Sequence, residues 1–269
     1  MMNRRSFIAG LASAAAWPLA ARAQQGNRVR RIGVLLGFDE NDPVAKPRLS
    51  AFTQALAGLG WTVGRNVRIY LRWGDADINR IRALAHELVG LQPEIILANA
   101  TAATVALQQE TRTIPIVFAT VADPVAQRIV PRLNQPGGNI TGFATNEASV
   151  GGKWLELLSE IAPGLKRAAI MFNPDTGPVS AHMPSLEAAA RSLNVAPITA
   201  PVRSDEEIET AITALGREPG GGFVSLAGAF MNAHRVPIIL AAARNNVPAV
   251  YNASSFARDG GLSPTEPTR

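Results

Sequence analysis

Short apolar runs alternate along most of this chain with segments whose apolar residues recur at helical spacing. The runs are rich in β-branched residues, as in Thr113–Ala119, which leads into Asp123-Pro124 and has the pattern of a buried strand. The intervening segments carry apolar stripes such as Leu49, Phe52 and Leu56. The same patterns predict strands at Val67–Trp73 and Ala196–Pro201, a short helix after Asp123, a helix capped by Asp205 and a helix at Asn232–Asn245. This alternation predicts an α/β fold, in which helical crossovers join parallel strands and cover both faces of each sheet.

The alternation restarts near Gly151, so we predict two Rossmann-like lobes with parallel sheets, joined by a hinge. Lobe one is expected at 28–142 and lobe two at 143–262. The 269 residues are sufficient for two domains of ordinary size. The polar, proline-rich segment 263–269 is expected to be a disordered tail. Two hinged lobes are the usual architecture for closing around a ligand.

The amino-terminal segment predicts export. Arg4 and Arg5 precede a short apolar stretch of small residues and then Ala21-Arg22-Ala23, which has the small-x-small form of a cleavage site. The stretch is shorter than the ~20 residues that a bilayer requires. We therefore predict a twin-arginine-type signal peptide at 1–23, cleavage after Ala23 and a periplasmic location. A general secretory signal with two incidental arginines is the alternative.

Charge and composition restrict the function classes. The formal net charge is +5, and removal of Arg4, Arg5 and Arg22 leaves 5 − 3 = +2. A nucleic-acid partner is therefore not expected, because such proteins concentrate basic residues on one face. The chain has no cysteine, which excludes disulfides and thiolate metal sites.

Familiar catalytic and cofactor motifs are missing from the sequence. It contains no dinucleotide-binding fingerprint, no phosphate-binding loop with Gly-Lys-Ser/Thr and no Gly-x-Ser-x-Gly elbow. His86, His182 and His234 lie far apart in the sequence, and each is expected on a helix surface. We accordingly predict no cofactor and no metal site.

Candidate binding residues follow the predicted strands, because ligands of open parallel sheets bind at the carboxyl ends of the strands. Asp123 and Asp175 occupy equivalent strand ends in the two lobes. They could form a hydrolytic pair, hold an ammonium group of a ligand, or cap helices. Thr101 is placed to cap the helix that follows it, where the amino terminus could also receive an anionic group.

Several longer motifs occur in a characteristic order between Arg30 and Leu262, and the most specific is Pro136–Gly142. The others are Arg31–Leu35, Ala51-Phe52, Gly60-Trp61, Gly64–Val67, Ile114–Phe118, Asp123–Val125, Gly152–Leu158 and Phe172–Pro174. With these motifs the chain resembles the ABC-importer substrate-binding proteins of the type I periplasmic-binding fold, in the branch that includes tryptophan and tyrosine binders.

The resemblance implies a protein that captures a small, amino-acid-like solute, aromatic solutes included, and delivers it to an ABC permease in the inner membrane. It also implies that the protein is a monomer and not an enzyme. Tyr251 could stack on an aromatic ligand or complete the core. The ligand-binding residues that the resemblance and the topology imply are Gly37, Phe38, Thr101, Ala102 and Asp123 in lobe one, and Asn173, Gly228 and Tyr251 in lobe two.

The chain departs from the family pattern in two places. Family members usually continue past Gly260–Leu262 with a long helix that returns to lobe one, whereas here 263–269 follows, so a carboxy-terminal truncation is expected. Ala227–Met231 lacks an acidic residue that the family tends to have, which leaves the polarity of the ligand open. The alternatives are a truncated, non-functional family member and a secreted hydrolase that uses Asp123 and Asp175.

Overall fold

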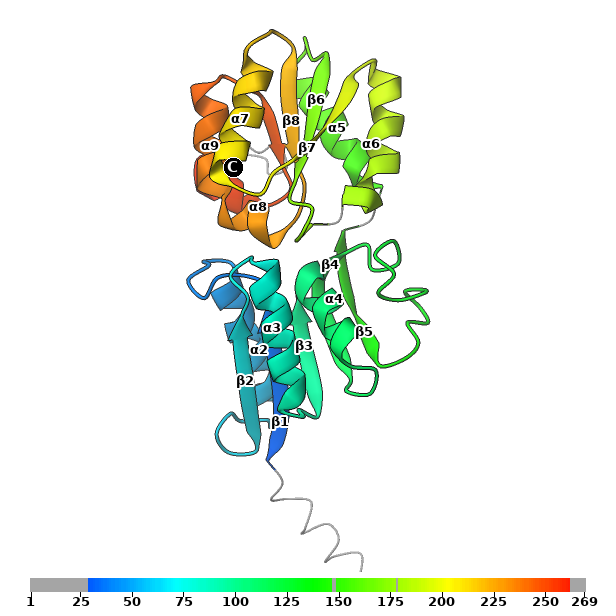
Figure 1. Cartoon of the computed structure of the whole chain (residues 1–269), viewed down its shortest axis with the longest axis vertical. Coiled ribbons are helices and arrows are strands. Elements are labelled where there is room, and N and C mark those ends of the chain that lie inside the picture. Colours follow the sequence, from blue (N-terminus) through cyan, green and yellow to red (C-terminus); the bar gives the residue numbers. More distant parts are fainter. Residues whose placement is uncertain (1–28, 147–148, 178, 262–269) are drawn as a thin grey trace, which may run out of the picture.

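The computed structural model describes residues 29–146, 149–177 and 179–261, which form two α/β lobes stacked along the long axis of the molecule (Figure 1). The expected signal peptide, 1–23, and the expected tail, 263–269, lie outside the described residues. Lobe one contains β1 (Arg30–Leu36), α2 (Ala45–Gly58), β2 (Val67–Trp73), α3 (Ile78–Gly90), β3 (Ile95–Asn99), α4 (Thr101–Glu110), β4 (Ile116–Ala122) and β5 (Ile140–Asn146). Lobe two contains α5 (Val150–Ile161), β6 (Arg167–Phe172), α6 (Val179–Leu193), β7 (Ala196–Pro201), α7 (Asp205–Gly216), β8 (Gly221–Ser225), α8 (Ala229–Ala233), α9 (Arg235–Arg244), β9 (Ala249–Tyr251) and α10 (Ser254–Arg258).

Each lobe is built on one parallel sheet. The strand order is β2-β1-β3-β4-β5 in lobe one and β7-β6-β8-β9 in lobe two. Every pairing between these strands is parallel. The predicted fold class, α/β with parallel sheets and helical crossovers, is therefore confirmed.

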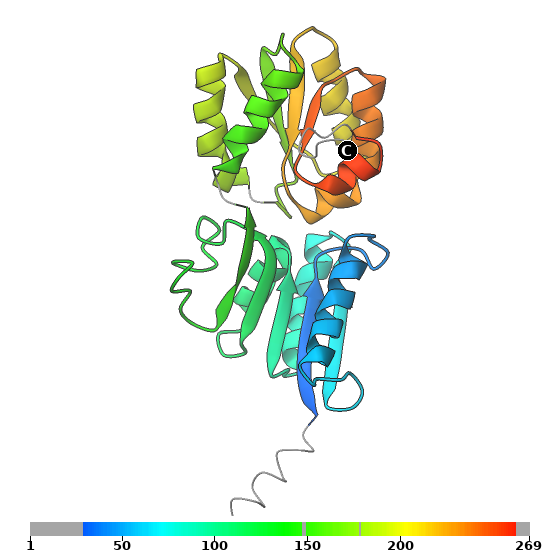
Figure 2. The same ribbon diagram turned by 180° about the vertical axis from the view of Figure 1, so that it is seen from behind.

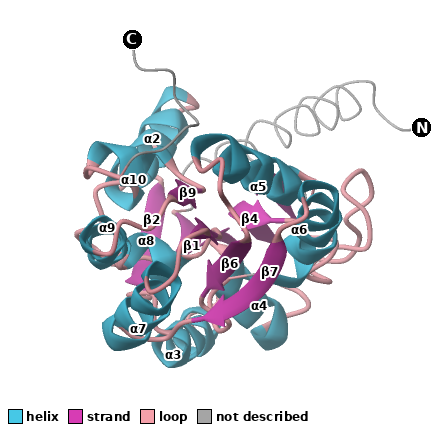
Figure 3. Cartoon of the chain, turned by 90° about the horizontal axis from the view of Figure 1, so that it is seen from above, coloured by secondary structure: helices cyan, strands magenta, loops and turns pink. Residues whose placement is uncertain are grey.

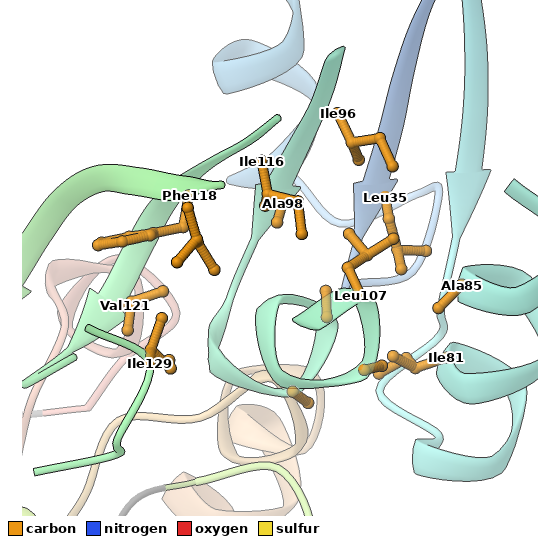
Figure 4. Close-up of a cluster of buried hydrophobic side chains, with 14 of the residues drawn as sticks. Leu35, Ile81, Ala85, Ile96, Ala98, Leu107, Ile116, Phe118, Val121 and Ile129 are labelled. Atoms are coloured by element: carbon orange, nitrogen blue, oxygen red, sulfur yellow. The ribbon is translucent and has the colours of Figure 1, made fainter. Parts of the chain in front are cut away.

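The core of lobe one is divided by its sheet. Alternate residues of β1 point to opposite faces, so that Leu35 packs towards α3 and α4 while Val34 packs towards α2. Figure 2 shows α2 on the face opposite α3 and α4. Figure 4 shows the larger cluster, in which Phe118 and Ile116 of β4 meet Leu107 of α4. The helices therefore hold the sheet in place from both sides.

Lobe two repeats this arrangement on its own sheet. Met171 of β6 belongs to the cluster with α7 and α9, whereas its neighbour Ile170 belongs to the cluster with α5 and α6. Viewed from above, α5 and α6 lie on one side of the strands and α7 and α9 on the other (Figure 3). Because helices cover the faces of both sheets, the loops lie at the ends of the strands.

The last strand of lobe one is longer than the sequence indicates. The expected boundary between 142 and 143 falls inside β5, which remains paired with β4 as far as Ala122 and Asn146. The pairing is irregular between Phe118 and Val121. A Cβ on Gly142 would overlap the carbonyl oxygen of Phe118, so glycine permits this close approach.

The segment after β4 contains turns where the sequence predicts a short helix. Residues 124–138 form no helix. The carboxylate Oδ1 of Asp123 accepts a hydrogen bond from the amide of Ala126 at 3.0 Å, which closes the first turn. Arg128 then adopts a φ of 56°, and this left-handed conformation prevents a helix from continuing.

The helix predicted at Asn232–Asn245 is two helices, α8 and α9. The chain leaves helical geometry at His234, with φ −95° and ψ 18°. Pro237 has no amide hydrogen and cannot donate to the carbonyl of Ala233, as a continuous helix would require. The proline therefore falls in the first turn of a new helix.

Two predicted helix caps are also wrong by one residue. Thr101 is the first residue of α4, whose N-cap is Ala100 and which has no side-chain cap. The cap of α7 is Ser204, whose hydroxyl accepts from the amide of Glu207, and not Asp205. In each case the residue before the expected one takes the non-helical cap conformation.

The prediction for the three histidines holds for His86, which lies on the surface of α3 and pairs with Glu110. His234 is half-buried at the break between α8 and α9, where it pairs with Asp205. His182, by contrast, is only 1% exposed, and its ring centroid lies 5.2 Å from that of Trp154. Packing of α6 against α5 buries this histidine.

Candidate functional site

A cavity of about 370 Å³ lies between the lobes, where the strand ends of the two sheets face each other. Parallel sheets bind ligands at this edge, because the loops there converge. Lobe one contributes Phe38, Val44, Arg48, Ala100, Thr101, Thr120, Ala122 and Thr145. Lobe two contributes Ala227, Gly228, Ala229, Asn232, Asn252, Ala253, Ser254, Ser255 and Arg258.

The loop after β1 is held close to the start of α4. The amide of Gly37 donates to the carbonyl of Asn99 at 3.1 Å, and a Cβ on Gly37 would lie 3.1 Å from that of Ala100. Ala100 itself adopts a φ of 80°, which is strained for a residue with a side chain. This close contact brings Phe38 and Thr101 to the same wall of the cavity.

A second strained residue stands at the end of β4. Thr120 has a φ of 54°, which a β-branched residue rarely adopts, and its hydroxyl donates to the carbonyl of Ala119 at 2.7 Å. Thr120 lines the cavity together with Thr145 of the adjacent strand. Strain of this kind persists only where the surrounding structure imposes it, and it is concentrated at functional sites.

The lobes touch each other directly beside the cavity. Ala229 of lobe two is buried in one cluster with Phe38, Ala45 and Ala100 of lobe one. Asn232 Nδ2 donates to Asp42 Oδ2 across the lobes at 2.7 Å. The described arrangement is therefore a closed one, with a shared apolar contact and a hydrogen bond between the lobes.

Among the described residues that line the cavity, the charged ones are Arg48 and Arg258. The guanidinium carbon of Arg48 lies 5.8 Å from the ring centroid of Phe38, within range of a cation–π contact. Burial lowers the pKa of Arg48, and the nearby carboxylate of Asp42 opposes this shift. Arg258 Nη2 donates to the hydroxyl of Ser254 at 2.8 Å.

Three of the predicted binding residues, Phe38, Thr101 and Gly228, line this cavity. Ala102 lies in a neighbouring pocket of about 180 Å³ that Thr101 shares. Gly37 supports the loop that carries Phe38, because its amide donates a hydrogen bond to the carbonyl of Asn99. The sequence therefore placed these residues at the edge of the sheets where the cavity lies, and their contact with a solute stays a prediction.

The other three predicted residues stabilise turns or pack in the core of lobe two. Asp123 closes the turn described above. Asn173, 3% exposed, accepts from the amides of Asp175 and Thr176 and so shapes the turn after β6. Tyr251 is 3% exposed and stacks on Phe256, with ring centroids 4.7 Å apart.

The two aspartates of the hydrolase alternative have local partners. Asp123 binds the amide of Ala126, and Asp175 pairs with Arg203, with 3.2 Å between Oδ2 and Nε. Neither carboxylate belongs to the lining of the 370 Å³ cavity, although Asp175 lines the neighbouring pocket. The geometry gives this pair no shared substrate position.

Sequence reasoning missed most of the polar lining. Arg48 lies on α2, where the apolar stripe predicts which residues face the core but not which polar residues face the cavity. Ser254 and Arg258 lie on the short helix α10, which had no periodic signal. The available signal was position alone, since Asn252 and Ser254 directly follow the last strand.

In the part of the chain that the structure describes, no group of three or more His, Cys, Asp or Glu residues could hold a metal ion. No helix there has the length and apolar character needed to cross a bilayer.

Comparison with known proteins identifies the family. A family model described as ABC transporter substrate binding protein matches residues 40–264. A curated relative, the tyrosine-binding protein of Clostridioides difficile (strain R20291), is 27% identical over 164 residues, which are 61% of this chain and 47% of the relative. The match thus spans about half the length of that relative.

Solved structures share the fold. A conserved domain protein from Vibrio cholerae superposes with a TM-score of 0.77 at 23% identity, covering 87% of this chain and 78% of the other. An ABC domain from Streptococcus pneumonia, in complex with L-Trp, has a TM-score of 0.76 at 20% identity, covering 87% and 77%. The resemblance found in the sequence motifs is confirmed, and the chain belongs to the ABC transporter substrate-binding protein family.

Proposed function

We propose that this protein is the substrate-binding component of an ABC importer, which captures a small organic solute between its lobes and passes it on unchanged. The observation that carries the proposal is the 370 Å³ cavity formed jointly by the strand-end loops of both lobes. The direct contact between the lobes beside this cavity supports it, since closure over a ligand couples binding to recognition by a partner.

The solute is proposed to be amino-acid-like, with aromatic solutes included. This class is suggested by the names of similar proteins, a tyrosine-binding protein and a domain in complex with L-Trp. We assign direct solute contacts to Phe38, Thr101 and Gly228, which line the cavity. Gly37, Ala102, Asp123, Asn173 and Tyr251 are assigned to the shape of the surrounding loops and core.

The proposal includes a location and a partner. Export through the twin-arginine-type segment at 1–23, with cleavage after Ala23, would place the protein in the periplasm. There it would act as a monomer and deliver its solute to a permease of the inner membrane. No catalytic step on the solute is part of the proposal.

A thermal melt in the presence of candidate solutes tests this function. A ligand that binds only the folded state stabilises it by about 2.7 kcal/mol at 100 times its Kd. For a protein of this size, that corresponds to a rise of roughly 5–10 °C in Tm. The panel should contain amino acids and organic acids, aromatic members included. A cooperative melt whose midpoint no member of this panel moves would contradict the proposal.

A further inference from the structure

The charged side chains in the described lining of the cavity are both positive. Arg48 enters from α2 of lobe one and Arg258 from α10 of lobe two, and no acidic residue is part of the described lining. Within the described residues, neither arginine has an ion-pair partner within 4 Å. A solute between the lobes therefore meets positive charge from both sides, which the carboxylate of Asp42 partly offsets on the side of lobe one.

The acidic side chain that acts on Arg48 is Asp42, which is hydrogen-bonded through both of its oxygens. Asp42 is 6% exposed, and its Oδ1 accepts from the amides of Val44 and Ala45 at 2.8 and 2.9 Å. Its Oδ2 accepts from Asn232 Nδ2 at 2.7 Å, which leaves one acceptor position on this oxygen. Asp42 is not part of the described cavity lining, so an ammonium group in the cavity is not placed to use that position.

Other acidic residues near the cavity are paired with arginines. Asp259, next to Arg258 in the chain, binds Arg235 through its Oδ2. Asp175 of the neighbouring pocket binds Arg203. A buried ammonium group without a carboxylate or a comparable acceptor set loses its hydration without replacement, which is strongly unfavourable.

A carboxylate, by contrast, finds several donors. Guanidinium groups form charge-assisted hydrogen bonds with carboxylates. Thr101 begins α4 without a side-chain cap, so the amides of its first turn are available at the same wall. The hydroxyl of Ser254 accepts from Arg258 and keeps its own hydrogen as a neutral donor.

We infer that the cavity selects an organic acid that carries a carboxylate but no ammonium group, and that Arg48 and Arg258 hold this carboxylate side from opposite lobes. The inference rests on the proposed capture of a small organic solute, and it replaces the amino-acid-like class by organic acids that lack the ammonium group. In this inference, Arg48 and Arg258 cause the protein to bind an acid more tightly than the amino acid with the same carbon skeleton.

Matched pairs of solutes test the inference by titration calorimetry on the full mature chain. Each pair differs by the α-ammonium group: 3-phenylpropionate with L-phenylalanine, 3-(4-hydroxyphenyl)propionate with L-tyrosine, and indole-3-propionate with L-tryptophan. The acid of at least one pair is expected to bind about tenfold or more tightly than its amino acid. The corresponding primary amide, which lacks the negative charge, is expected to bind as weakly as the amino acid.

Variants connect the preference to the arginines. Arg48→Gln and Arg258→Gln should each weaken acid binding by about tenfold or more, the factor that follows from losing a hydrogen bond to a charged group. Arg48→Lys and Arg258→Lys keep the charge and should retain an intermediate affinity. Arg244→Gln is the matched control, because Arg244 pairs with Glu209 outside the cavity lining. A melt without solute checks that every variant folds cooperatively.

Three results would count against the inference in distinguishable ways. Tighter binding of the amino acids than of the acids would overturn it and leave the proposed function intact. Acid binding that is unchanged in both glutamine variants would remove the role of the arginines and overturn it as well. No binding by any compound to the cooperatively folded protein would contradict the proposed function, and the inference would fall with it.

Discussion

Tyr251 shows how burial decides the role of a single side chain in this protein. The residue ends β9 at the edge of the sheet where the cavity lies, yet its ring packs between Phe223 and Phe256. Burial raises the pKa of its hydroxyl from 10.0 to about 12. The side chain therefore belongs to the core of lobe two.

This shift predicts a loss of stability at high pH. The folded-state pKa of Tyr251 lies above the unfolded value, so its contribution is full below pH 10 and is lost as the pH rises towards about 12. The free energy of unfolding should fall by up to ~1.4 kcal/mol per pH unit in this window. Denaturant titrations from pH 9 to 12 should show this fall in the wild type and in Tyr70→Phe, which keeps Tyr251. A fall of equal size in Tyr251→Phe would contradict the assignment.

At the scale of residues, the sequence predicts which residues lie at the edge of a sheet better than it predicts which side chains line the cavity. Phe38 and Gly228 were found because they follow strands, and the topology of parallel sheets places such residues at one edge. Arg48 was not found, because only the packing of α2 in three dimensions determines which of its polar residues face lobe two. Arg258 was missed for a similar reason, since α10 is too short to give a periodic signal.

At the scale of elements, β5 approaches β4 so closely at Gly142 that a side chain there would overlap Phe118. Gly142→Ala would place a methyl group against the backbone oxygen of Phe118 and against its ring. We expect the free energy of unfolding to fall by about 3 kcal/mol, as for an overpacked core. Chemical denaturation measures this change.

Gly58→Ala is the control for that substitution. Gly58 lies in α2 with no atom near the position of a new Cβ, so alanine should be neutral or stabilise by about 0.5–1 kcal/mol. A Gly142→Ala variant as stable as the wild type would mean that β5 moves away from β4 without cost.

Elements with a clear pattern were predicted closely. The alternating strand at Val67–Trp73 and the strand at Ala196–Pro201 have the expected bounds. The boundary of β5 and the break at His234 were not predicted, because strand pairing and the missing amide of Pro237 decide them. Local propensity carries no information on a partner strand, which only the tertiary fold supplies.

At the scale of the whole molecule, the described residues of the two lobes meet in a small apolar contact and in the hydrogen bond between Asn232 and Asp42. Ala229 is 1% exposed and meets Ala100 and Phe38 of the other lobe. Asn232, which binds Asp42 across the lobes, also accepts from the hydroxyl of Ser255 at 3.0 Å. Small side chains at this contact let the two loops approach each other, so a larger one should hold the lobes apart.

Ala229→Leu tests this dependence of binding on closure. The added methyl groups would press on Phe38 and Ala100, and an overpacked contact costs ~1–3 kcal/mol, so solute affinity should fall by about 10- to 100-fold. Small-angle X-ray scattering should show that solute reduces the radius of gyration of the wild type but not of the variant. Ala233→Leu, at the exposed carboxy-terminal end of the same helix α8, should behave as the wild type. If Ala229→Leu lost affinity but still contracted with solute, the added side chain would be acting by filling the cavity and not by separating the lobes.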